Sequence, residues 1–291
     1  MSWRTVVITN RSKLDFKMGY MVVRGPENYR VFLGEIAILL IENPAVSLTG
    51  ILMEELVNRK IKVIFCDKTR NPVAEVNPYY GSHDCSKKVK LQIAWSAESK
   101  GKIWREIVSD KILKQSELLE KIGKFQEARM LKNYISEITD YDVTNREGHA
   151  AKVYFNALFG KSFSRGQDNV TNAALNYGYS IILSAFNREI ISNGYITQLG
   201  LFHDNIFNQF NLGCDFMEPF RILVDRHVYY GNIQELTSHE KYMLIDILNE
   251  SVIINGSKQT ALNAIKIYTK SIFDALNEEN ENLIKRYSYG L

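Results

Sequence analysis

The sequence predicts an α+β protein of two domains, a small N-terminal β domain with one helix and a larger, all-helical C-terminal catalytic domain. Residues 1–75 contain short runs rich in β-branched and aromatic side chains, separated by turn residues. From residue 76 to residue 291 the apolar side chains instead recur at steps of three and four, the period of a helix. Hydrophobic residues make up 45% of the 291 residues and charged residues 24%, which is the balance of a folded globular protein.

The β domain is built from apolar runs that are bounded by asparagine, glycine and proline. Its one helix is expected at residues 47–59, because the apolar side chains from Leu48 to Val57 fall at helical spacing. Pro72 and Pro78 mark the exit from the domain. Strands are expected at residues 5–9, 13–18, 20–24, 29–34, 36–42 and 61–66.

The second domain begins with a long helical pattern over residues 87–122, which contains few helix breakers. The final segment, residues 277–291, is polar and is expected to pack loosely. Further helices are expected at residues 126–138, 148–159, 172–192, 218–230, 239–249 and 260–276.

Charge and cysteine content restrict the functional classes. The net charge of +3 arises from 36 basic and 33 acidic residues, so any nucleic-acid surface must be local. Cys66, Cys85 and Cys214 show no CxxC spacing, which argues against a disulfide framework and a zinc knuckle and favours a reducing cytoplasm. The N-terminus lacks the features of a signal peptide, and the longest apolar run, residues 36–41, is far short of the roughly 20 residues of a membrane helix. No membrane span is expected.

Carboxylates and one imidazole in the helical half are the candidate ligands of a divalent cation. Glu147 lies in REGHAAKVYF and His203 in LGLFHDN, followed by Asp215 and Glu218 in GCDFMEPFR. Asp215 and Glu218 are three residues apart and would share one face of a helix. Glu218 stands among apolar neighbours, where a carboxylate needs a cation. This set predicts a metal site.

Each of these residues also has a structural interpretation. Glu147 follows Thr144 at the spacing of a capping box at the start of a helix. His203 follows an apolar stretch, where a histidine commonly makes hydrogen bonds within the core. Asp215 and Glu218 can instead be acidic residues in the first turn of a helix, where the helix dipole favours them. Residue types and spacing leave both interpretations open.

Several segments resemble the CRISPR-associated integrase that inserts new spacers, and specifically its short type II form. The resemblance spans most of residues 1–230. The segments that carry it are RTVVITNRSKLDFKMGYMVVR, LTGILMEELVNRKIKVIFCD, REGHAAKVYFNALFG, residues 168–183 and LGLFHDNIFNQFNLGCDFMEPFRILVD.

The resemblance implies catalytic metal ligands at Glu147, His203 and Glu218, with Asp215 as an outer or alternate carboxylate. Many members of the family have a second histidine where this chain has Asp204, and many have aspartate at the last ligand; neither departure removes a needed donor. The family also implies that the N-terminal domain forms a dimer and that the helical domain holds the active site.

The implied activity is metal-dependent endonuclease and integrase chemistry, in which a DNA 3′-hydroxyl attacks a phosphodiester. Two carboxylates with one imidazole suit Mg²⁺ or Mn²⁺, because they leave positions open for water and phosphate. The DNA would be double-stranded, the prespacer and the CRISPR repeat. Its phosphates would be contacted by basic side chains close to the ligands in sequence, although a solvated charge explains each equally well. These side chains are Arg146, Lys152, Arg165 and Arg221.

The family further implies a homodimer in the prokaryotic cytoplasm, joined to a small ferredoxin-like companion. In type II systems it also implies a ring-forming DNA-end protein and the RNA-guided effector nuclease. Three other functions are considered. A general metal-dependent nuclease would use the same ligands, and a non-catalytic DNA-binding scaffold would use none. A tyrosine recombinase is disfavoured, since no cluster of arginines and histidines around a tyrosine is evident.

Overall fold

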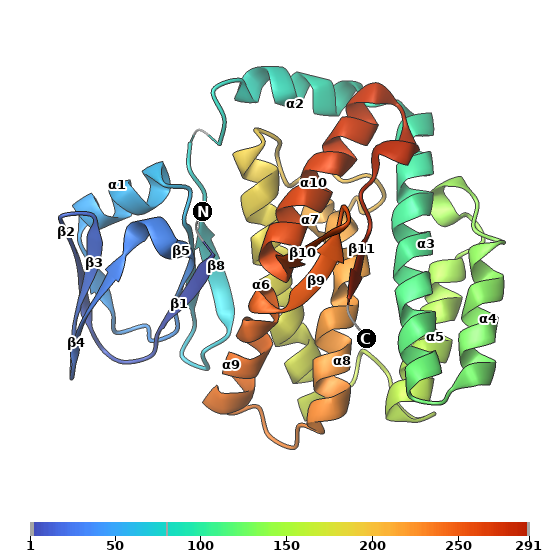
Figure 1. The fold of residues 1–291 in the computed structure, drawn as a ribbon, viewed down its shortest axis with the longest axis horizontal. Helices are drawn as coiled ribbons and strands as arrows, with labels where there is room; N and C mark the ends of the chain where they lie inside the picture. Colours follow the sequence, from blue (N-terminus) through green and yellow to red (C-terminus); the bar gives the residue numbers. More distant parts are fainter. Residues whose placement is uncertain (1–2, 80, 290–291) are drawn as a thin grey trace.

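The computed structural model describes residues 3–79 and 81–289. The strand-rich N-terminal part lies beside a larger part in which long helices run side by side (Figure 1). The division into an α+β molecule agrees with the sequence prediction, and the N-terminal part contains one α-helix, α1 (Gly50–Asn58).

Two four-stranded sheets form the N-terminal part. In the first sheet, parallel β5 lies between β1 and β7, so Leu39 pairs with Val6 on one side and with Val63 on the other. All six residues of β5 are buried, as expected of a central strand of a parallel sheet. In strand order the first sheet is β1 (Arg4–Ile8), β5 (Ile36–Ile41), β7 (Lys62–Cys66) and β8 (Pro72–Val76), and the second is β4 (Asn28–Phe32), β3 (Tyr20–Arg24), β2 (Lys13–Lys17) and β6 (Ser47–Leu48).

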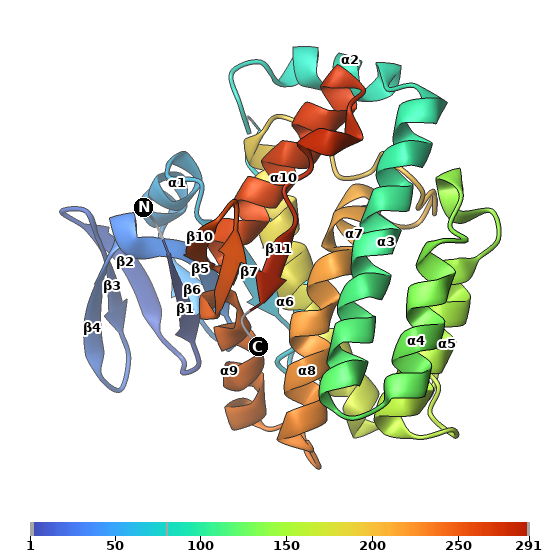
Figure 2. The ribbon, with the colours of Figure 1, turned by 45° about the vertical axis from the view of Figure 1, so that its right-hand side comes forward.

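The helical part is organised around α3 (Ala97–Lys121), which contacts α4, α5 and α8 (Figure 2). The expected continuous helix over residues 87–122 is wrong, because the chain leaves the helical conformation at Trp95 and Ser96 caps a new helix by accepting the Ser99 N–H. The other helices are α2 (Cys85–Ala94), α4 (Phe125–Ile135), α5 (Arg146–Phe159), α6 (Val170–Ser192), α7 (Asn211–Met217), α8 (Arg221–Gly231), α9 (Ser238–Asp246) and α10 (Ala261–Glu278).

The C-terminal part also contains a sheet, so the expectation of an all-helical domain is wrong. Its antiparallel strands, in the order β10, β9 and β11, lie against α10 (Figure 2). Each strand has only three or four residues, too short for periodicity to distinguish it from a turn. The strands are β9 (Ser251–Ile254), β10 (Ser257–Thr260) and β11 (Tyr287–Tyr289).

The end of the final segment is packed rather than loose, which corrects a third expectation. Tyr287 and Tyr289 are both buried, and they donate hydrogen bonds to the carbonyl oxygens of Pro219 (2.8 Å) and Lys114 (3.1 Å). Tyr287 also stacks on Phe220 with ring centroids 4.1 Å apart. The alternation of Tyr, Ser and Tyr places both rings on the same face of a strand. Residues 290 and 291 lie outside the described residues.

Within the described part of the chain, none of the helices has the length and apolar character needed to cross a membrane.

Candidate active site

Two of the predicted ligands, from distant parts of the chain, meet at one lysine. Glu147 is the second residue of α5, and Glu218 opens a short 3₁₀ turn (Glu218–Phe220) between α7 and α8. Lys111, in the middle of α3, places its Nζ atom 2.5 Å from Glu147 Oε1 and 2.5 Å from Glu218 Oε2. Sequence reasoning missed Lys111, because one lysine in a long helix carries no local sign of such contacts.

The charges around Glu218 keep it ionised. Its side chain is buried, and Arg221 Nε lies 3.0 Å from Glu218 Oε1. Burial alone opposes ionisation, but Arg221 and Lys111 outweigh it and lower the pKa of Glu218 to about 2. Burial likewise disfavours the charge on Lys111, but Glu147 and Glu218 raise its pKa. Glu218 is therefore an ionised carboxylate held by the ammonium of Lys111 and the guanidinium of Arg221.

His203 is oriented by Asp215 rather than by the carboxylates of that cluster. Its Nδ1 lies 2.6 Å from Asp215 Oδ1, and this hydrogen bond raises the pKa of His203. When Asp215 is ionised, Nδ1 carries the proton and the lone pair of neutral His203 remains on Nε2. The His203 side chain is 37% exposed, so the ring is accessible. Asp215 is thus placed to set the tautomer of His203, one of the predicted ligands.

Asp215 also fixes the backbone that carries His203. Its buried carboxylate accepts the N–H groups of Leu201 (2.6 Å), Phe202 (3.2 Å) and His203 (3.1 Å). Gly200 is required for this close approach, since a Cβ at that position would lie 2.3 Å from the His203 carbonyl oxygen and 2.7 Å from Asp215 Oδ2. The histidine is therefore held through both its ring and its main chain.

Aromatic rings pack behind His203. Phe202 stacks on the buried Trp104 of α3, with centroids 4.6 Å apart and planes 3° from parallel. The His203 ring meets Trp104 edge-on at 5.8 Å. The histidine is consequently supported by α3, the same helix that carries Lys111.

The start of α5 is capped by Asp142, which excludes the capping box proposed for Thr144 and Glu147. Asp142 accepts the N–H groups of Arg146 and Glu147, each at 2.8 Å, whereas the Thr144 hydroxyl faces the Glu137 carbonyl oxygen at 3.4 Å. The carboxylate of Glu147 is therefore free to contact Lys111. A capping role does not explain the presence of an acidic residue at this position.

Of the four basic residues expected to contact DNA, Arg221 alone belongs to this cluster. Arg146 forms an ion pair with Glu137 at 3.0 Å. Arg165 donates hydrogen bonds to the side chains of Asn172 and Asn176. Lys152 is exposed on α5. DNA contacts by these residues stay a prediction.

Arg221 rests on a buried network of phenols. Its guanidinium carbon lies 4.6 Å from the Tyr179 ring centroid. Tyr179 and Tyr154 both donate hydrogen bonds to Asp225, whose pKa burial raises to about 6. Burial also raises the pKa of both phenols. Tyr179 thus supports the Arg221 guanidinium. Both tyrosines are buried, so they are not the exposed, activated phenols that a tyrosine recombinase needs.

The donor set suits a divalent cation that takes oxygen ligands. Two carboxylates from separate elements contact the Lys111 ammonium, and His203, oriented by Asp215, is near enough to Glu218 and Glu147 for their charges to add to the effect of Asp215 in raising its pKa. Among the described residues no group of three His, Cys, Asp or Glu side chains is close enough to hold a metal, and the Lys111 ammonium lies between the Glu147 and Glu218 carboxylates. The residues fit the ion, provided that Lys111 yields this position.

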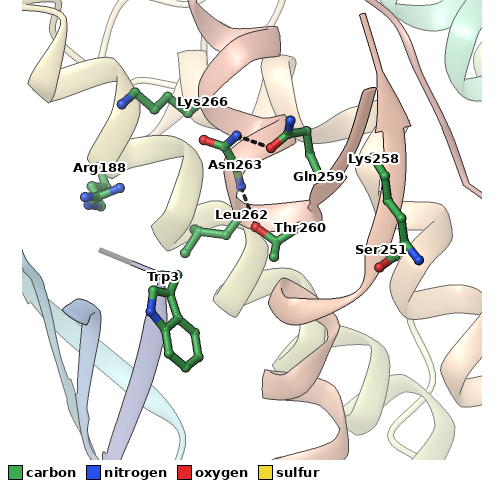
Figure 3. A pocket seen from close by; sticks show the side chains of 9 residues that line it. All are labelled: Trp3, Arg188, Ser251, Lys258, Gln259, Thr260, Leu262, Asn263 and Lys266. Carbon is green, nitrogen blue, oxygen red and sulfur yellow. Dashed lines mark hydrogen bonds between the residues drawn. The ribbon is translucent and has the colours of Figure 1, made fainter. Parts of the chain in front are cut away.

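A separate basic groove of about 520 Å³ lies between the start of β1 and the C-terminal sheet (Figure 3). Trp3, Arg188, Lys258 and Lys266 line it, and none of the candidate metal ligands does. Beside it, Thr260 caps α10 by accepting the Asn263 N–H at 3.2 Å.

The comparisons with known proteins agree with one another. The family described as CRISPR associated protein Cas1 matches residues 5–243. The CRISPR-associated endonuclease Cas1 of Neisseria meningitidis serogroup C is 34% identical, over 98% of this chain and 96% of the relative. A CRISPR-associated endonuclease Cas1 of Francisella tularensis subsp. novicida is 26% identical, over 96% and 91% of the two chains.

Solved structures share the fold at lower sequence identity. A casposase bound to integration product superimposes with a TM-score of 0.79 at 17% identity, over 97% of this chain and 92% of the other. A Cas1 protein from Thermotoga maritima gives 0.76 at 17% identity, over 94% and 97%. The family match over most of the chain, together with the Neisseria relative, shows that the chain belongs to the CRISPR-associated Cas1 family.

Proposed function

We propose that this chain is a metal-dependent DNA endonuclease and integrase of CRISPR adaptation, which joins the 3′ ends of prespacer DNA to the CRISPR repeat by transesterification. The observation that carries the proposal is the pair of carboxylates, Glu147 and Glu218, that faces a single cation position next to an oriented histidine. The curated relatives are named endonucleases, and a casposase of the same fold is described as bound to integration product.

We propose Glu147, His203 and Glu218 as the metal ligands, with Mg²⁺ or Mn²⁺ as the ion. Such an ion supplies Lewis-acid polarisation of a phosphodiester oxygen and stabilises the charge that develops on the leaving oxygen. Asp215 holds the His203 tautomer, and Arg221 holds the Glu218 carboxylate from the side opposite Lys111. Lys111 holds both carboxylates together, and with an ion bound between them its ammonium would be available to a DNA phosphate.

The wider assembly is also proposed. We place the domain division near residue 75, with the N-terminal β domain as the dimerisation surface. Double-stranded DNA and a small ferredoxin-like companion are the expected partners, since two solved structures of this fold are complexes named with Cas1 and Cas2. The type II form, and with it the ring-forming DNA-end protein and the RNA-guided nuclease, is supported by the Neisseria relative.

A plasmid assay separates integration from simple hydrolysis. A labelled duplex with free 3′-hydroxyl ends is incubated with a supercoiled, repeat-bearing plasmid, the chain and its companion. Joined, labelled plasmid is the result expected for an integrase. Plasmid nicked without incorporated label would identify a hydrolytic nuclease with the same ligands.

Substitution of the ligands tests the metal site. Glu147→Ala, His203→Ala and Glu218→Ala should each abolish Mn²⁺-dependent joining, a loss larger than the roughly 10- to 100-fold that is typical when only a group behind a metal ligand is removed. His149→Ala is the matched control, because His149 is exposed on the same helix, two residues from Glu147. Dimerisation, measured by light scattering, should be unchanged. Joining by all three ligand variants would refute the proposal and leave a non-catalytic DNA-binding scaffold.

A further inference from the structure

The segment that carries His203 exposes an unusual amount of apolar surface. We define the His203 loop as residues 198–209, between α6 and α7. Ile206 and Phe207 are 88% and 89% exposed, and Leu199 and Phe202 are 41% and 44% exposed. Large apolar side chains that gather in one exposed segment mark a contact surface, since water disfavours them.

The tip of this loop is held in place by hydrogen bonds. Asn205 Oδ1 accepts the Phe207 N–H (2.9 Å), and the Asn205 carbonyl oxygen accepts the Asn208 N–H (2.9 Å). Asn211, the first residue of α7, donates its side-chain amide to the carbonyl oxygens of Asn205 and Gln198, each at 3.1 Å. The tight turn therefore presents Ile206 and Phe207 outward, and the rest of the molecule gives them no place to fold back.

The base of the loop is coupled to the site. Asp215 binds the backbone of residues 201–203 and the ring of His203, and Phe202 is stacked on Trp104 of α3. The apolar tip begins three residues after His203. Whatever the tip contacts therefore lies at the same face as the substrate of that histidine.

The chemistry of the tip matches nucleic-acid bases better than phosphates. Residues 204–209 contain no Lys or Arg, and their one charge, on Asp204, repels phosphate. They combine two apolar side chains with the exposed amides of Asn205 and Gln209, whereas the Asn208 amide is bound to the Phe210 N–H and to Cys214 Sγ. Apolar side chains inserted between base steps, together with amide groups that bind base edges, are how proteins unstack and bend a duplex.

We propose that Ile206 and Phe207 form a wedge that enters a base step beside the phosphodiester attacked at the site, and so opens the duplex locally. The inference rests on the proposed function for the position of the DNA. The wedge itself needs no chemical step, because it acts when DNA binds.

Fluorescence of 2-aminopurine tests the wedge without catalysis. The base is placed at the steps that flank the junction of a branched DNA resembling a half-integrated product, and the full chain is added in EDTA. Unstacking raises the fluorescence. The wild-type chain should produce the rise at one step, and Ile206→Ser with Phe207→Ser should remove it and weaken binding roughly 5- to 150-fold, the range for one lost stacking contact.

Matched variants keep the test specific. Phe207→Trp retains a large ring and should preserve the fluorescence rise. Phe125→Ala is the control, because Phe125 is 66% exposed at the start of α4. It follows the C-terminal end of α3, which lies roughly 15 Å along that helix from Lys111 at 1.5 Å per residue. It should leave both fluorescence and binding unchanged. The serine substitutions replace exposed groups, and an unchanged melting temperature would show that the variant is folded.

The outcomes separate the wedge from the proposed function. A rise that persists in the double serine variant, or no rise with the wild-type chain at any flanking step, would overturn the wedge while the joining assay still judges the integrase. Unchanged DNA binding together with a changed oligomeric state or loss of companion binding would identify the tip as a protein contact, which also overturns it. Loss of joining in the ligand variants with an intact fluorescence rise would support both.

Discussion

Two lysines one turn apart on α3 have opposite surroundings. Lys111 contacts Glu147 and Glu218, which come from two other elements and lie next to an exposed histidine. Lys114 pairs with Asp110 of the same helix, with both side chains 3% exposed, and its Nζ lies 4.4 Å from the centroid of the Tyr287 ring. Burial lowers the pKa of Lys114, whereas the two carboxylates raise that of Lys111.

The difference shows what makes a charged cluster suitable for a metal. Around Lys111 the two carboxylates come from different elements and Glu218 is also held by Arg221, an arrangement in which we propose that a divalent ion replaces the lysine. Lys114 instead forms a buried pair with Asp110, and the Tyr287 ring packs against its ammonium. The first arrangement predicts exchange of the lysine for an ion, and the second predicts a structural pair.

The largest expected effect is at Lys111. Lys111→Met should lower the free energy of unfolding by about 3–5 kcal/mol in EDTA, because it leaves two carboxylates facing each other without their shared cation. Added Mn²⁺ should recover more stability in this variant than in the wild-type chain, since the ion supplies the missing charge. Chemical unfolding with and without Mn²⁺ measures both values. An equal response of the two proteins to Mn²⁺ would contradict exchange at this position.

A smaller effect is expected at the histidine. Asp215→Asn should lower the pKa of His203, because the hydrogen bond that favours the imidazolium is weakened. The folded pKa of His203 lies above its ordinary value of 6.5, so its contribution to stability is complete below that value and is lost as the pH rises through the folded pKa. NMR titration of the His203 ring in the metal-free protein measures the shift. An unchanged or raised pKa would show that Asp215 does not set the protonation of His203.

The smallest response to Mn²⁺ is expected where the pair is structural. Asp110→Leu combined with Lys114→Met should change the free energy of unfolding by no more than about 2 kcal/mol, because a buried ion pair is readily replaced by apolar groups of similar size. Lys114→Met alone should cost about 3–5 kcal/mol, since it leaves Asp110 buried without a partner. Mn²⁺ should rescue neither variant. Recovery of the single variant by Mn²⁺ would remove the distinction between the two lysines.

The predictions from sequence succeeded where the signal was local and repeated. The helix of residues 172–192 was recognisable because many consecutive residues follow the helical period, and β5 because it is a continuous apolar run. The short strands β9 and β11 failed this criterion, and the pairing of Tyr287 with Ile254 joins segments that no local pattern connects. The break at Trp95 and Ser96 was hidden in an otherwise helical pattern.

The candidate site shows the same division. Glu147, His203 and Glu218 could be nominated from residue type and from the resemblance, and the competing cap at Glu147 could not be dismissed until Asp142 was seen to occupy that role. Lys111 and the support of Arg221 by Tyr179 carried no sequence signal. The metal ligation itself stays a prediction, to be tested by the ligand variants.

By itself the amino-acid sequence determined the two kinds of architecture, through composition and periodicity along the chain; the resemblance of particular segments indicated the family, and residue types supplied the donor atoms. Tertiary structure alone decided which charges meet. Contacts such as Lys111 with Glu147 and Glu218 depend on how α3, α5 and the turn after α7 pack, and that packing is a property of the whole core.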